Sequence, residues 1–267
     1  MKKNRLIPIL LLKNGWLVQS KQFSRYQNLG NPVTAVRRLS EWGSDELIYL
    51  DISQDDTYDR RRSDQGPNRQ SFLEIIDDVS RAAFMPITVG GRIRTLADIE
   101  NRLKVGADKV SVNSQAFADK EFITQAAKEF GSQCIVASMD AKTIEGRHIV
   151  VFRGGREVSP YSPVEWAKNL ESQGAGEILL NSVDRDGMKT GYDLELLASV
   201  CEQVKIPVIA CGGAGEWSHF AQAFEKTKVD AVAAANIFQY IDQSVYLAKK
   251  YLFEHGFNVR PPDLLTI

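Results

Sequence analysis

Cysteine is scarce in this sequence, and the few cysteines present are far apart. The 267 residues include three, at positions 134, 201 and 211, and none forms a CxxC pair. An odd number of widely spaced cysteines argues against a disulfide framework. Because proteins without structural disulfides are typical of reducing compartments, we expect a cytoplasmic protein. We predict neither a bound metal nor a cofactor.

The sequence also lacks a long apolar run and an excess of charge of either sign. The net charge is −1, so no overall field favours nucleic acid or an anionic membrane. No apolar run approaches the roughly 20 residues that a membrane-spanning helix needs. The segment MKKNRLIPILLL superficially resembles a signal peptide, but Lys13 and Asn14 end its short apolar run and no small-residue cleavage site follows. We interpret residues 5–12 as a core strand, and expect neither nucleic acid nor a membrane as partner.

Short β-rich runs alternate with amphipathic helical patterns along the chain. Patterns such as NPVTAVRRLSEWG (31–43) and SPVEWAKNLESQG (162–174) separate most of the runs. Strands separated by helices indicate βαβ units and a parallel sheet. Eight such units favour a single (βα)8 TIM barrel of the α/β class over a doubly wound open sheet. The predicted strands are residues 5–12, 46–52, 87–89, 109–113, 135–139, 177–181, 208–210 and 231–235.

The sequence also repeats itself at long range. GSDELIYLDIS (43–53) matches GAGEILLNSVD (174–184), and PITVGG (86–91) matches PVIACGG (207–213) with an offset of one residue. LIPILLLKN (6–14) matches CIVASMDAK (134–142), which places Leu11 opposite Asp140. Repeats so far apart do not predict a solenoid. They predict one domain, residues 1–267, built from two homologous half-barrels at about 1–130 and 131–260 with a short tail at 261–267.

Glycine-rich loops follow predicted strands at corresponding places in the two halves. CGGAG (211–215) pairs with ANIF (235–238), and GGRIR (90–94) pairs with NSQAF (113–117). Glycine lets the backbone approach a ligand, and free N–H groups at a helix start bind anions. The loops predict two phosphate sites at the C-terminal face, and hence a bisphosphorylated or otherwise long, two-ended ligand. The alternative is that the glycines only form tight turns.

Several of these motifs together resemble one enzyme family. TVGGRIR, ADKVSVNS, FGSQCIV, DAK, GAGEILLNSVDRDGMKTGYDLEL and IPVIACGGAG are similar to the cyclase subunit of imidazole glycerol phosphate synthase. The resemblance implies a barrel of two halves and a glutaminase partner that docks at the N-terminal face. Ammonia would then cross the barrel and cyclise a bisphosphorylated ribotide at the C-terminal face. That family uses two aspartates, at the ends of strands 1 and 5, as acid and base, and the second corresponds to Asp140.

The resemblance further implies a gate and a set of ligand-binding residues. The family's charged ring, a gate for ammonia at the barrel bottom, maps onto Arg5, Glu46, Lys109 and Glu177. These residues open predicted strands, and side-chain parity along three of the strands predicts that they face inward. The alternative is a set of ordinary solvated ion pairs. The implied phosphate and ligand positions are Gly91, Arg92, Asn113, Ser114, Asn181, Asp186, Gly187, Gly212, Gly213, Ala235 and Asn236.

At the C-terminal face the sequence departs from the family pattern. Leu11 replaces the strand 1 aspartate and can neither accept nor donate a proton, whereas general acid–base catalysis is typically worth 10²–10⁴-fold. Arg92 stands where the family has a third glycine, and the family's catalytic lysine aligns with Gln19, although Lys21 is nearby. The loop at 53–68 is longer than in the family and dense in charge, which is also typical of a solvated loop.

These departures leave three hypotheses. The first is a divergent paralogue that supplies ammonia to another acceptor, as in bacterial lipopolysaccharide or surface-glycan biosynthesis, where a separate sugar amidotransferase converts an acetamido into an acetamidino group. The second is a working cyclase of histidine biosynthesis, with Asp140 sufficient or Asp51 substituting. The third is a non-catalytic scaffold that activates the glutaminase. The family features kept at the barrel bottom and altered at the top favour the first hypothesis.

Overall fold

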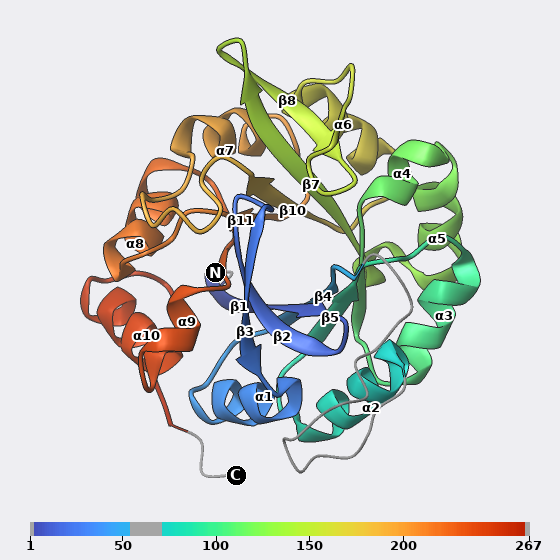
Figure 1. Ribbon diagram of the computed structural model, residues 1–267. Coiled ribbons are helices and arrows are strands. Elements are labelled where there is room, and N and C mark those ends of the chain that lie inside the picture. Colours follow the sequence, from blue (N-terminus) through green and yellow to red (C-terminus); the bar gives the residue numbers. More distant parts are fainter. Residues whose placement is uncertain (1–2, 54–70, 265–267) are drawn as a thin grey trace.

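Eight parallel strands close into a barrel in the computed structural model, which describes residues 3–53 and 71–264 (Figure 1). The ring is closed because β7 pairs with β6 on one side and with β10 on the other, where Asn181 is in register with Asp140. The closed ring confirms the predicted TIM barrel and excludes the open sheet. In barrel order the strands are β7 (Ile135–Ile144), β10 (Glu177–Ser182), β11 (Val208–Cys211), β12 (Ala231–Ala234), β1 (Arg5–Lys13), β4 (Leu47–Asp51), β5 (Ile87–Gly90) and β6 (Lys109–Val112).

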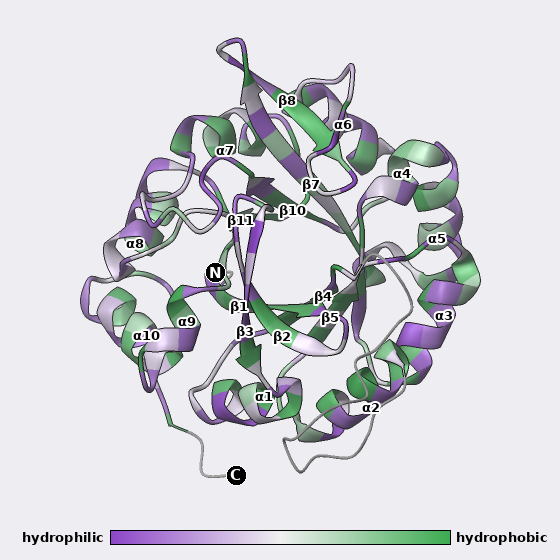
Figure 2. Cartoon of the chain, viewed as in Figure 1, coloured by the Kyte–Doolittle hydropathy of each residue, from purple (hydrophilic) through white to green (hydrophobic). Residues whose placement is uncertain are grey.

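Helices surround the strands, with their apolar faces turned toward the barrel (Figure 2). Several begin at side chains that cap the free backbone N–H groups; Thr95 and Ser162 each form a capping box, with Asp98 and Glu165 respectively. The helices are α1 (Pro32–Glu41), α2 (Phe72–Ala82), α3 (Leu96–Lys104), α4 (Ser114–Ala118), α5 (Phe122–Phe130), α6 (Pro163–Ser172), α7 (Leu194–Cys201), α8 (Trp217–Lys226), α9 (Ile237–Tyr240), α10 (Ser244–Glu254) and the 3₁₀ turn η1 (Ser132–Cys134). No helix within the described residues is both long and apolar enough to cross a membrane.

Alternate residues of the strands pack into two separate cores. Those facing the helices form the large outer core, whereas the inward-facing residues form a small cluster inside the barrel. On β1 the inward residues include Ile7 and Ile9, and Leu11 packs against the same cluster. The period of two along a strand therefore places Arg5 and Leu11 on one inward face, at opposite ends of the barrel. The other members of the inner cluster are Ile48, Val136, Leu179, Ile209, Ala231 and Ala233.

Two antiparallel extensions of barrel strands, each of two further strands, project beyond the C-terminal face, and the sequence interpretation missed both. β1 turns at Asn14–Gly15 into β2 (Trp16–Lys21) and β3 (Arg25–Gly30), and β7 turns at Glu145–Gly146 into β8 (Arg147–Phe152) and β9 (Glu157–Val158). All four turn residues have positive φ, which is the signature of the two-residue turns that suit the twist of paired strands. Asn-Gly is itself a strong hairpin signal in a sequence. Half-barrels at 1–130 and 131–260 remain a prediction.

Candidate functional site

Four charged side chains form a closed ring at the N-terminal end of the barrel. Arg5, Lys109 and Glu177 open their strands, and Glu46 directly precedes β4. Nitrogen atoms of Arg5 lie 2.6 Å from a carboxylate oxygen of Glu46 and 2.8 Å from one of Glu177. Lys109 Nζ lies 3.1 and 2.9 Å from oxygens of the same two residues. The structure therefore brings together all four residues that the sequence indicates, with each cation contacting both anions.

The ring is mostly buried rather than solvated, with exposed side-chain fractions between 10% and 20%. Burial lowers the pKa of Arg5, but the carboxylates of Glu177 and Glu46 outweigh this effect and raise that pKa above its ordinary value. Buried charges persist when they are paired, and removal of one partner leaves the others uncompensated. The four contacts thus close the ring within the chain.

Asp140 lies at the opposite end of the barrel, on β7. Its Oδ2 accepts a hydrogen bond from Asn113 Nδ2 at 2.8 Å, and its Oδ1 accepts one from Asn181 Nδ2 at 3.1 Å. Burial raises the pKa of Asp140 to about 6; the two amide hydrogen bonds oppose this rise, and the charge of Asp186 adds to it. A carboxylate with a pKa near neutrality suits a general base or acid at physiological pH.

Leu11 occupies the inward position on β1 at the level of the barrel mouth. Together with Leu50, Cys211 and Ala235 it packs against the apolar cluster inside the barrel. Asp51 was the residue expected to substitute for an acid at position 11. It pairs in register with Leu12, not with Leu11, and Leu12 faces the outer core. Because neighbouring strand positions face opposite sides, Asp51 does not take the place of an inward carboxylate at position 11.

The first predicted phosphate loop packs closely on β4. A Cβ atom at Gly91 would lie 2.0 Å from the carbonyl oxygen of Asp51, so this position requires glycine. Arg92 follows with φ 56°, a left-handed conformation that costs a residue other than glycine about 1 kcal/mol. Its Nη1 lies 4.0 Å from Asp51 Oδ2. Ser114, at the start of α4, accepts a hydrogen bond from the backbone of Arg153 at 3.3 Å.

The second predicted phosphate site lies beneath the β2–β3 hairpin. Ser20 Oγ donates to Asp186 Oδ2 at 2.9 Å, and Asn236 Nδ2 donates to the Ser20 carbonyl at 3.0 Å. A Cβ atom at Gly187 would lie 2.6 Å from that same carbonyl. Burial raises the pKa of Asp186, and the hydrogen bonds from the hairpin oppose the rise. The structure thus places three predicted ligand-binding residues against the hairpin, a long-range contact without a local sequence signal.

The same hairpin separates the two candidates for the family's lysine. Gln19 Nε2 donates to Gln27 Oε1 across the hairpin at 2.6 Å. For Lys21, a Cβ atom at Gly187 would lie 3.0 Å from the Cα of this lysine. The Lys21 backbone therefore lies beside the second predicted phosphate loop. In the loop at 53–68, residues after Ser53 fall outside the described residues.

The loops after β11 and β12 complete the mouth. Gly212 and Gly213 have φ of 92° and 107°, and a Cβ atom at Gly213 would lie 2.2 Å from the carbonyl oxygen of Gly191. Ala235 packs against the cluster inside the barrel. Within the part of the chain that the structure describes, no group of three or more His, Cys, Asp or Glu side chains could hold a metal ion.

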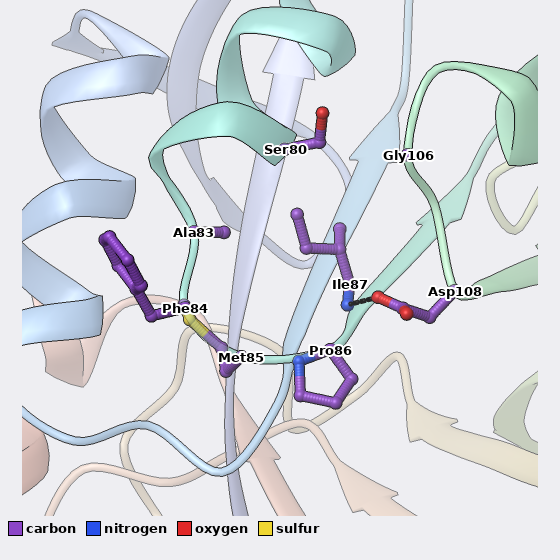
Figure 3. A pocket seen from close by; sticks show the side chains of 8 residues that line it. All are labelled: Ser80, Ala83, Phe84, Met85, Pro86, Ile87, Gly106 and Asp108. Atoms are coloured by element: carbon purple, nitrogen blue, oxygen red, sulfur yellow. Dashed lines mark hydrogen bonds between the residues drawn. The ribbon is translucent and has the colours of Figure 1, made fainter.

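A pocket of about 330 Å³ opens beside the charged ring, and no sequence pattern indicated it (Figure 3). It lies between the end of α2 and the loops that precede β5 and β6. Figure 3 shows Phe84 and Asp108 on opposite sides of it. Asp108 directly precedes Lys109 of the ring, and the Pro86 carbonyl accepts from Leu47 N, next to Glu46. Phe84 is 65% exposed, a large fraction for an aromatic side chain.

Known proteins resemble this chain over almost its whole length. A family model described as "Histidine biosynthesis protein" matches residues 5–243. The imidazole glycerol phosphate synthase subunit HisF of Geobacillus kaustophilus (strain HTA426) is 45% identical over 258 residues, covering 96% of this chain and 98% of that protein. The subunit of the same name from Anoxybacillus flavithermus (strain DSM 21510 / WK1) has the same identity and coverage. The chain therefore belongs to the histidine biosynthesis protein family, as a relative of the HisF subunit of imidazole glycerol phosphate synthase.

Proposed function

We propose that this chain is the ammonia-using subunit of a glutamine amidotransferase complex, and that it serves an acceptor other than the ribotide of histidine biosynthesis. The observation that carries the proposal lies on β1. At one end Arg5 keeps its place in the closed ring, whereas at the other end Leu11 presents only carbon to the interior. The closed ring thus supports a path for ammonia. Leu11 does not supply a second proton-transfer group opposite Asp140.

The interior between the two ends suits a neutral molecule. Aliphatic side chains fill it, with the small residues Ala231 and Ala233 on β12. An apolar interior disfavours an ion far more than an uncharged molecule. Ammonia released by a glutaminase would cross as NH3 after the ring opens, and the ring contacts of Lys109 and Arg5 make these residues the gate.

The glutaminase partner would dock on the N-terminal face, over the ring. A partner that delivers ammonia must seal the ring from water, so its footprint should extend to the pocket beside Asp108 and Lys109. The exposed Phe84 then supplies an aromatic anchor, the residue type enriched at the energetic centres of interfaces. This face therefore offers both a charged centre and an apolar contact next to it.

At the mouth, Asp140 would act alone as the acid or base. A buried carboxylate with a pKa near 6 can take a proton from nitrogen as that nitrogen bonds to carbon. The favoured acceptor is a phosphorylated precursor or nucleotide-linked form of a bacterial surface sugar, with a separate sugar amidotransferase completing the conversion of acetamido to acetamidino. Arg92 has a φ that usually belongs to glycine, and its guanidinium changes the chemistry of the first phosphate loop. This change also favours an acceptor other than the ribotide.

Two alternatives remain. The family membership favours a working cyclase of histidine biosynthesis, in which Asp140 suffices. A non-catalytic scaffold that only activates the glutaminase is the second; the buried, hydrogen-bonded Asp140 argues against it.

Genetic complementation separates the proposal from the first alternative. A histidine auxotroph without its own cyclase subunit is given this chain together with its glutaminase partner. We expect no growth without histidine, while the HisF of Geobacillus kaustophilus in the same vector restores growth. Growth supported by this chain would overturn the proposal.

A purified variant tests the role assigned to Leu11. Leu11→Asp should raise ammonia-dependent turnover of the ribotide by about 10²-fold over Leu11→Asn, because only Asp adds a titratable group. Asn has nearly the same shape, so the comparison isolates proton transfer. Equal turnover by both variants would show that Leu11 does not limit cyclisation.

A further inference from the structure

Two carboxamide oxygens beside Asp140 lack a partner. Asn113 and Asn181 each donate through Nδ2 to one carboxylate oxygen of Asp140, and the Oδ1 atoms of both are buried without a hydrogen-bond partner among residues 3–53 and 71–264. Asn181 is only 8% exposed. Native proteins rarely leave buried acceptors unpaired, because each such atom costs free energy. The two oxygens therefore point to a ligand.

The carboxylate decides which way the amides face. Ionised Asp140 offers acceptors only, so each amide must turn its NH2 group toward it and its oxygen away. Turning either amide round would set oxygen against oxygen. The two free Oδ1 atoms are consequently acceptors, which the N–H or O–H groups of a ligand, or a cation, can satisfy.

Strand register and the neighbouring glycine place these oxygens at the mouth. On β10, Asn181 is in register with Asp140 of β7 on one side and with Cys211 of β11 on the other. A Cβ atom at Gly212 would lie 2.8 Å from Asn181 Oδ1, so this oxygen packs directly against the glycine backbone. Asn113 reaches Asp140 from the end of β6.

We propose that Asn113 and Asn181 bind the incoming ammonia, their Oδ1 atoms accepting two of its N–H bonds beside Asp140. This inference rests on the proposed function, in which ammonia reaches the mouth. Ammonia carries three N–H donors and one lone pair, so two held N–H bonds leave the lone pair free. A phosphate monoester dianion cannot satisfy the same oxygens, because it carries no hydrogen-bond donor. An alkali cation could coordinate them but has no lone pair to attack the acceptor, and potassium serves as its probe.

The arrangement accounts for one proton transfer. The nitrogen lone pair forms a C–N bond with an electrophilic carbon of the acceptor, and the electron pair of the attacked C=X bond moves to X. The nitrogen, now positively charged, releases one proton to the Asp140 carboxylate. Holding the nitrogen by its N–H bonds keeps that proton next to Asp140 throughout the step.

Nuclear magnetic resonance of the side-chain NH2 groups tests the proposal without an acceptor. The ¹⁵N-labelled chain is titrated with ammonium chloride, with potassium chloride and with potassium phosphate at equal ionic strength. Potassium matches ammonium in charge and nearly in size but has no hydrogen to donate. We expect ammonium alone to shift the Asn113 and Asn181 signals saturably. Equal shifts with potassium or with phosphate, or no shift with ammonium, would overturn the proposal.

Variants then test the pair of oxygens. Asn181→Leu should weaken the apparent affinity for ammonium, followed at Asn113, by at least fivefold. Asn101→Leu, at an exposed position on α3, should leave it unchanged. An unaltered response in Asn181→Leu would exclude the two-oxygen site. Because the wild-type titration is decisive by itself, poor folding of a variant does not leave the proposal untested.

Failure here and failure of the proposed function look different. Growth of the histidine auxotroph would reject the acceptor assignment and leave the ammonium titration unaffected. A titration without ammonium-specific shifts would reject the binding site and leave the acceptor open.

Discussion

The two ends of this barrel treat their polar groups in opposite ways. At the N-terminal end, each cation of the ring contacts both carboxylates, so the charges are paired within the chain. At the C-terminal end, Asp140 holds two amide nitrogens while the amide oxygens of Asn113 and Asn181 have no partner among the described residues. A self-paired ring can act as a gate, whereas a set of free acceptors requires a ligand for completion. In the proposed function, this difference would separate the delivery of ammonia from the choice of its acceptor.

Asp140→Asn should remove proton transfer at the C-terminal end without affecting the charged ring, and it should have the largest effect. Without a titratable group beside the nitrogen, formation of the pathway product should fall by about 10²-fold or more. Mass spectrometry of the modified surface sugar, in cells that depend on this chain, measures the product. Glutamate release by the glutaminase should continue. Asp119→Asn, which changes an exposed carboxylate, is the control. Unchanged product in Asp140→Asn would favour the scaffold.

Lys109→Met should disrupt the charged ring at the N-terminal end. It leaves Glu46 and Glu177 with Arg5 as their only ring partner, so the free energy of unfolding in urea should fall by about 2–3 kcal/mol. Product formed from glutamine should decrease, while product formed from added ammonium salt should not, because the mouth is intact.

Lys104→Met is the matched control for this change. Lys104 pairs with Glu100 on the surface of α3, at 2.6 Å and with 64% of its side chain exposed. Exposed pairs of this kind contribute little, so stability should change by less than about 0.5 kcal/mol. Equal losses in the two variants, or equal losses from both nitrogen sources, would contradict a gate at Lys109.

Phe84→Ser should sharpen the distinction between docking and catalysis. If Phe84 anchors the glutaminase, its loss should weaken binding by about 1–2 kcal/mol, or roughly five- to thirtyfold in Kd by calorimetry. Ammonia-dependent activity should stay unchanged, since the pocket lies at the other end of the barrel from Asp140. Val158→Ser changes a similarly exposed apolar residue on β9, beyond the C-terminal face, and should leave Kd unaltered. An unchanged Kd in Phe84→Ser would show that Phe84 does not anchor the glutaminase.

Local periodicity predicted the barrel, whereas the family resemblance indicated the ring and side-chain parity supported it. Side-chain parity along β1 relates Arg5 to Leu11, and alternation of strands with helices indicates the eight units. The internal repeat by itself places Leu11 opposite Asp140. The boundaries of β7 were wrong, since the strand continues to Ile144 into a hairpin whose turn is Glu145–Gly146.

The mouth was less predictable because long-range packing decides it. Nothing local relates Ser20 to Asp186, which are 166 residues apart and hydrogen-bonded. The exclusion of Asp51 from the inward face required the register with Leu12. The orientation of the two amides likewise depends on a carboxylate from another strand. Sequence spacing shows which residues approach the mouth, and only coordinates show which of their atoms are already bonded.

The smallest expected effect concerns the pH dependence of stability at the C-terminal end. Burial raises the pKa of Asp140 to about 6 in the folded chain, from 3.8. Its favourable contribution is therefore complete below the unfolded pKa and is lost as pH rises through the folded one. Between about pH 5 and about pH 8, urea unfolding should show wild type losing about 1 kcal/mol relative to Asp140→Asn. Activity should follow the opposite course and fall below about pH 6, because protonated Asp140 cannot accept a proton. A stability difference that stays constant over this range would mean that Asp140 titrates as it does in the unfolded chain, and would remove the basis for assigning it a base near neutrality.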